Sequence, residues 1–138
     1  VDPDVARLKR LLARYESKRS SIYSEYQTRW ESANREWKVC SDSGDAECTW
    51  EVWRRFSLWN LNQNKVMARL LTELKAQASI AGRCSGAFDD ALSHHTKLVL
   101  LYQEDIDANE ARDNDRSKTT ADRINSESKR AVWVTCTP

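Results

Sequence analysis

The stretch CTWEVWRRFSLWNLNQNKVMARLLTELK, residues 48–75, decides the fold of this chain. Its apolar side chains recur at steps of three, four or seven residues, and Gln63 is the polar exception in the series. The series consists of Cys48, Val52, Phe56, Trp59, Val66, Leu70 and Leu74. This spacing is typical of a helix with one buried face, and Gly82 supplies a stop signal beyond it.

The residues before this stretch carry the same periodicity and predict a first helix over residues 3–39. Asp2 can accept hydrogen bonds from the first free amides, and Pro3 needs no backbone partner at the first helical position. A short polar turn over residues 41–46 follows, and we expect its Asp45 to cap the next helix. Within the first helix we expect a bend at Ser20 and Ser21. The apolar stripe is Val5, Leu8, Leu12, Tyr15, Ile22, Tyr26, Trp30, Ala33, Trp37 and Cys40.

Two further helices are predicted after Gly82. We expect Ser85 to cap the third helix, whose stripe is Phe88, Leu92, His95, Leu98, Val99, Tyr102 and Ile106. A turn is expected within residues 112–118. Thr119 and Asp122 then resemble a capping box for a fourth helix, which carries the sparse apolar residues Ile124, Ala131 and Val134.

Composition supports an all-α fold in one domain, residues 1–138. The chain has 3 glycines and 2 prolines, too few for the many tight turns of a sandwich or barrel. Short connections favour antiparallel neighbours, so we expect an up-down four-helix bundle.

The four cysteines fit this topology in one way. Cys40 and Cys48 lie at one end of the bundle, whereas Cys84 and Cys136 lie at the other. The pairs Cys40–Cys48 and Cys84–Cys136 are therefore the ones compatible with the roughly 6 Å between Cα atoms that a disulfide requires. An even set without metal-site spacing indicates a secreted protein whose cysteines are oxidised, and the alternative is four reduced thiols in a cytosolic bundle.

Several classes of function lack support in the sequence. Lysine and arginine number 22 against 21 acidic residues, a net charge of +1, so we expect neither nucleic acid nor a membrane as partner. No glycine-rich phosphate loop or nucleophile elbow is present. His94 and His95 point about 100° apart on a helix and cannot readily share a metal, and the Asp90–His94 spacing suits a solvated contact. We therefore expect no catalytic residue, cofactor or metal.

Charge is nevertheless unevenly distributed, with two blocks at opposite ends of the predicted bundle. Either block could be a solvated face or could steer a partner of opposite charge. The basic block is Arg7, Lys9, Arg10, Arg14, Lys18 and Arg19, and the acidic block is Glu104, Asp105, Asp107, Glu110, Asp113 and Asp115.

Five of the six tryptophans lie in the hairpin formed by the first two helices. Trp30, Trp37 and Trp59 fall on the apolar stripes, so we expect them in the core. A second face of the second helix points away from its stripe and has the composition of a protein-binding hot spot, unless another helix covers it. Its partner-binding candidates are Trp50, Trp53, Arg54, Leu58 and Leu61.

The chain as a whole, with residues 48–75 opening its second helix, resembles the anopheline mosquito salivary proteins typified by anophensin and albicin. The resemblance implies a secreted, disulfide-bonded helical bundle that acts in saliva. Albicin-like members inhibit the alternative complement pathway by binding its convertase, and anophensin-like members inhibit contact-phase coagulation.

We accordingly expect a non-enzymatic inhibitor of host defence whose partner is a host plasma protein, first of all the alternative-pathway convertase. A contact-phase, collagen or platelet inhibitor is the alternative within this class. A carrier of small hydrophobic ligands is the alternative from another class, and it predicts a pocket of several hundred cubic ångströms.

Overall fold

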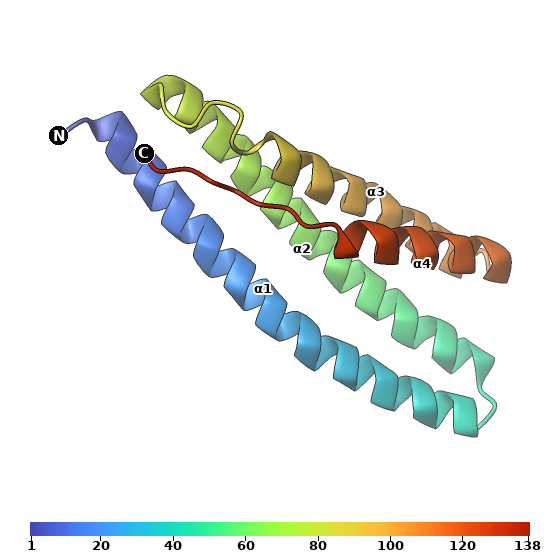
Figure 1. The fold of residues 1–138 in the computed structure, drawn as a ribbon. Coiled ribbons are helices and arrows are strands. Elements are labelled where there is room, and N and C mark those ends of the chain that lie inside the picture. Colours follow the sequence, from blue (N-terminus) through green and yellow to red (C-terminus); the bar gives the residue numbers. More distant parts are fainter.

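The computed structural model describes all 138 residues and contains four helices and no strand (Figure 1). The helices are α1 (Pro3–Asp42), α2 (Ala46–Ala81), α3 (Asp89–Glu110) and α4 (Asn114–Lys129). Each packs against its neighbour in sequence, so the chain runs up, down, up and down. The all-α four-helix fold is confirmed. None of the helices is both long and apolar enough to cross a membrane.

Helix α1 begins, and α2 begins and ends, where their sequence signals lie. Asp2 accepts hydrogen bonds from the first amides of α1, and Asp45 accepts one from the Cys48 amide. Gly82 ends α2 with φ +65°, a left-handed conformation that costs glycine little. α1 runs three residues further than predicted and remains one helix through Ser20 and Ser21.

The predicted caps of the last two helices are wrong. Ser85 lies in a turn, and α3 begins at Asp89, directly after Phe88, whose side chain is fully buried. Asp113 caps α4 by accepting from the Arg116 amide, so the connection after α3 is only three residues long. Thr119 and Asp122 consequently lie inside α4.

α4 is also shorter than predicted, because residues 130–138 are extended and run back beside α1 (Figure 1). Ala131 and Val134 therefore belong to this C-terminal tail and not to a helix. Seven extended residues advance about 23 Å, whereas seven helical residues advance about 10 Å. The extended conformation thus brings Cys136 within reach of Cys84.

Both predicted disulfides are present. The Cα atoms of Cys40 and Cys48 lie 5.5 Å apart, and those of Cys84 and Cys136 lie 5.4 Å apart. The two bonds mark opposite ends of the molecule, as the up-down topology requires.

The interior contains three apolar clusters. The smallest, at the Cys40–Cys48 end, consists of Ala33, Cys40 and Val52, and polar side chains separate the other two. The first cluster fills the Cys84–Cys136 end and contains Leu8, Leu11, Tyr15, Met67, Leu71, Leu74, Ala78, Phe88 and Ala91, with Val132, Val134 and Cys136 of the tail packed against it. The second contains Leu61, Leu98, Tyr102, Ile106 and Ile124. Between them the half-buried His95 ring lies 2.8 Å from the side-chain oxygen of Asn64.

Candidate functional site

Helix α1 packs against α2 and does not reach α3 or α4. No Cα atom of α1 lies within 8 Å of a Cα atom in α3 or α4. Residues of all four helices line a cleft of about 680 Å³ at the Cys40–Cys48 end, with α1 and α4 as its walls. We call it the aromatic cleft.

Each helix contributes one stripe of side chains to the aromatic cleft. The aromatic side chains come mainly from the first two helices: Tyr26, Trp30 and Trp37 of α1, and Trp50, Trp53 and Phe56 of α2. α3 contributes Tyr102, Asp105 and Asn109, whereas α4 contributes Asn114, Ser117, Ala121, Ile124 and Asn125. Most of the α4 side chains are small and polar, so they leave the space opposite the tryptophans unfilled.

The aromatic rings pack on one another and still remain partly open to solvent. The Trp30 ring lies 5.8 Å from the rings of both Trp53 and Phe56, measured between centroids, in tilted contacts typical of aromatic pairs. Trp30 is nevertheless 41% exposed and Trp37 is 40% exposed, whereas Trp59 is 9% exposed. The prediction of a core position is confirmed for Trp59 and wrong for Trp30 and Trp37, because only α2 packs against α1 here.

The second predicted face, on α2, is largely covered by α3. Leu61 is 4% exposed and packs with Leu98 and Tyr102, so its outward placement is wrong. Arg54 forms an ion pair with Glu110 of α3 at 3.6 Å.

Of the other partner-binding candidates on that face, two line the aromatic cleft and one is partly exposed to solvent. Trp50 and Trp53 line the cleft, while Leu58 is 39% exposed. The cleft is also lined by Tyr26, Phe56 and Tyr102, whose places on the apolar stripes predicted only burial. The signal that could have found the cleft is the run of small polar residues along α4.

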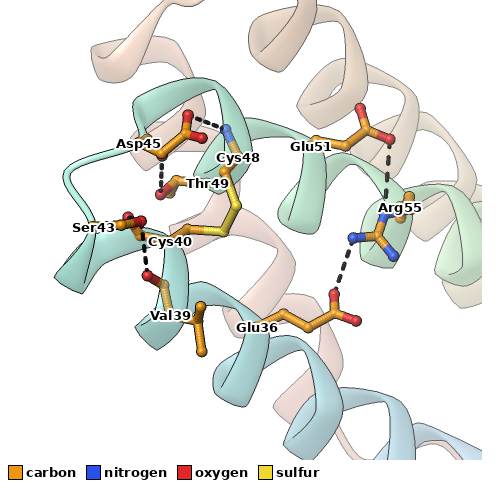
Figure 2. Close-up of a disulfide and its surroundings, with 9 residues drawn as sticks. All are labelled: Glu36, Val39, Cys40, Ser43, Asp45, Cys48, Thr49, Glu51 and Arg55. Atoms are coloured by element: carbon orange, nitrogen blue, oxygen red, sulfur yellow. Dashed lines mark hydrogen bonds and ion pairs between the residues drawn. A yellow bond between two sulfur atoms is a disulfide. The ribbon is translucent and has the colours of Figure 1, made fainter.

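The wall formed by α1 is fixed to α2 at the hairpin end (Figure 2). The Cys40–Cys48 disulfide joins the two helices there. One turn further in, the Arg55 guanidinium lies 3.0 Å from a Glu36 carboxylate oxygen across the hairpin and 3.7 Å from one of Glu51. The disulfide and the Arg55–Glu36 ion pair thus join α1 to α2 at the hairpin end, where both helices contribute tryptophans to the cleft.

Asp105 is the single charged residue that lines the aromatic cleft. The Ser57 hydroxyl donates a hydrogen bond to its carboxylate, and no cation pairs with it. Burial raises the pKa of Asp105, against the opposing effect of the Ser57 hydrogen bond. In contrast, its neighbour Glu104 pairs with Arg116 at 2.5 Å. Part of the acidic block is therefore neutralised locally, but Asp105 is not.

The two histidines lie outside the aromatic cleft, and His94 contacts a buried carboxylate. His94 is 9% exposed, and its Nδ1 atom lies 3.1 Å from a carboxylate oxygen of the buried Glu127, which Arg130 also contacts. Burial alone would raise the pKa of Glu127, but the hydrogen bonds from Arg130 and His94 lower it overall. Asp90, predicted to contact His94, pairs with Arg130 at 2.8 Å. No three acidic, histidine or cysteine side chains are placed to share a metal ion.

No family model, no curated protein and no solved structure matches this chain. The candidate site is thus defined by its own chemistry: a half-open cleft lined by aromatic and small polar side chains, with one carboxylate that has no cationic partner.

Proposed function

We propose that this chain is a secreted, non-enzymatic inhibitor of host defence that binds its target in the aromatic cleft. The observation that carries the proposal is the partial exposure of Trp30 and Trp37 on the wall of the cleft. Large exposed aromatic side chains in a concave surface are typical of binding sites, since burying them on complex formation is strongly favourable. The two disulfides suit an oxidising extracellular compartment such as saliva.

The target we propose is a host plasma protein, first of all the assembled convertase of the alternative complement pathway. This choice rests on the resemblance to the anophensin and albicin proteins. The composition of the cleft fits a protein target, because tryptophan and tyrosine dominate interface hot spots. The alternative targets are contact-phase coagulation factors and the proteins that mediate platelet adhesion to collagen.

A haemolysis assay restricted to the alternative pathway tests this proposal. We expect inhibition at micromolar protein and at least a tenfold loss of potency in the double variant Trp30→Ala/Trp37→Ala. Trp133→Ala is the matched control, because Trp133 is 75% exposed on the tail and outside the cleft. It should retain full potency.

A wild-type protein that does not inhibit would remove the convertase as target, and clotting and collagen-induced platelet assays would then test the alternatives. Equal loss of potency in the control and the double variant would show that the cleft is the wrong surface.

The cleft volume favours a second candidate, a carrier of small hydrophobic ligands. A volume of about 680 Å³ falls within the range of roughly 300–1,000 Å³ usual for small-molecule sites. Native mass spectrometry of the secreted protein tests it. A co-purifying compound that is lost in Trp30→Ala/Trp37→Ala and kept in Trp133→Ala would support the carrier function.

A further inference from the structure

The position of Asp105 gives the aromatic cleft a charge preference. Asp105 lies on α3 between Tyr102 and Asn109, at helical spacings of three and four residues, so all three side chains share the cleft-lining face. Its carboxylate accepts from the Ser57 hydroxyl and has no cationic partner. A partly desolvated anion without a counterion is unfavourable, so a ligand that brings a positive charge gains more here than at an exposed carboxylate.

The walls of the cleft favour the same charge. Tryptophan and tyrosine faces attract cations, and enclosure strengthens the attraction because water is excluded. Two arginines of the protein already stack on tryptophan rings. The guanidinium carbon of Arg112 lies 5.4 Å from the ring centroid of Trp50, and that of Arg29 lies 5.3 Å from the ring centroid of Trp59. Neither arginine lines the cleft, and Trp30, Trp37 and Trp53 have no such partner. These three rings therefore remain available to a cation from outside.

Volume and lining together define the rest of the ligand. A space of about 680 Å³ is far larger than a bare ammonium ion, and seven of its 18 lining residues are aromatic. We propose that the aromatic cleft binds a small organic amine, with the ammonium group beside Asp105 and Ser57 and an aromatic or apolar body between the tryptophans. This inference rests on the second candidate function, a carrier of small ligands that uses the same cleft, and it names the class of ligand.

Other ligand charges fit this arrangement less well. An anionic ligand would bring a like charge against Asp105. A purely apolar ligand would bury the carboxylate further without supplying a partner, which costs free energy. The cleft should therefore rank ligands of one shape in the order cation, neutral, anion.

Isothermal titration calorimetry at pH 7 with three probes of similar shape tests the ranking. The probes are tryptamine, tryptophol and indole-3-acetate, which carry an ammonium, a hydroxyl and a carboxylate on the same ring system. We expect tryptamine to bind at least tenfold more tightly than tryptophol, and indole-3-acetate to bind most weakly.

Variants then assign the preference to Asp105. Asp105→Asn should weaken tryptamine binding to the level of tryptophol and leave tryptophol binding unchanged, which also shows that the variant folds. Glu110→Gln is the matched control, because Glu110 lies on the same helix, pairs with Arg54 and is outside the cleft. It should bind tryptamine as the wild type does. Trp30→Ala/Trp37→Ala should weaken both tryptamine and tryptophol.

Equal affinity of the wild type for tryptamine and tryptophol, absence of binding by all three probes, or full tryptamine binding by Asp105→Asn would each overturn the inference. The haemolysis assay separates this result from the proposed function. Inhibition that depends on Trp30 and Trp37 without amine binding would refute the amine site alone. Amine binding without inhibition would refute the complement target and leave the amine site in place.

Discussion

The two ends of this molecule use the same apolar stripe of α1 in different ways. At the Cys84–Cys136 end, Leu8 and Tyr15 are 0% and 3% exposed, since the extended tail covers the groove beside α1. At the Cys40–Cys48 end, Trp30 and Trp37 continue the stripe and stay about 40% exposed. We call these the closed end and the open end. An amphipathic stripe becomes core only where a further element packs on it.

The largest expected difference between the ends is in the cost of removing an aromatic ring. Phe88, at the closed end, is 1% exposed in the first apolar cluster. Phe88→Ala should lower the free energy of unfolding by about 3–5 kcal/mol, because it leaves a cavity as well as losing burial. Urea denaturation followed by circular dichroism measures the change.

The matched substitution at the open end is Trp37→Ala. We expect a loss of about 1–2 kcal/mol although the ring is larger, because Trp37 is already 40% exposed and its removal opens no closed cavity. Equal losses for Phe88→Ala and Trp37→Ala would contradict the distinction between the two ends.

The two disulfides should also contribute unequally to stability, with the larger contribution from the bond at the closed end. Cys84–Cys136 spans 52 residues and Cys40–Cys48 spans 8. By loop-closure entropy, these bonds contribute about 4 and about 2.5 kcal/mol, respectively. Thermal unfolding of the double variants Cys84→Ala/Cys136→Ala and Cys40→Ala/Cys48→Ala measures the two contributions.

The Cys84–Cys136 disulfide should also protect the C-terminal tail at the closed end. Without Cys84–Cys136, residues 130–138 should be cleaved by proteases faster than in the wild type, because the covalent tie is lost. Removal of Cys40–Cys48 should leave the tail protected. A tail that stays fully protected in both variants would show that its apolar contacts alone hold it.

A smaller effect is expected from His95, whose ring contacts Asn64 between the first and second apolar clusters. Burial lowers the pKa of His95 to about 4, whereas an unfolded histidine titrates near 6.5. The unfolded state therefore binds the proton more readily, so the stability from the neutral ring is complete above pH 6.5 and is lost as the pH falls towards 4. Between pH 7 and pH 4.5 the loss should be about 2–3 kcal/mol.

His95→Gln isolates this contribution, since glutamine cannot titrate in this range and can still donate to Asn64. Urea denaturation at the two pH values should show a smaller drop for the variant. The lowered pKa of Glu127 acts with the same sign and is common to both proteins, so it cancels in the difference. Identical pH dependence would mean that His95 is not the responsible group.

Most of the fold was predictable from local signals. Asp2, Asp45 and Gly82 marked helix ends because capping depends on a few neighbouring residues. Both disulfides followed from the topology, since cysteines at one end of a bundle have few partners. The candidate site was predicted less well: of the five residues chosen on α2, only Trp50 and Trp53 line the cleft.

The sequence by itself determined four helices, their order and their covalent ties, because periodicity, caps and cysteine positions act within or between adjacent elements. The tertiary structure alone decided that α4 stops at Lys129, that the tail fills the closed end and that the tryptophans of α1 face a cleft. The reason is that burial depends on what lies opposite a stripe. The spacing of apolar residues along one helix does not contain that information.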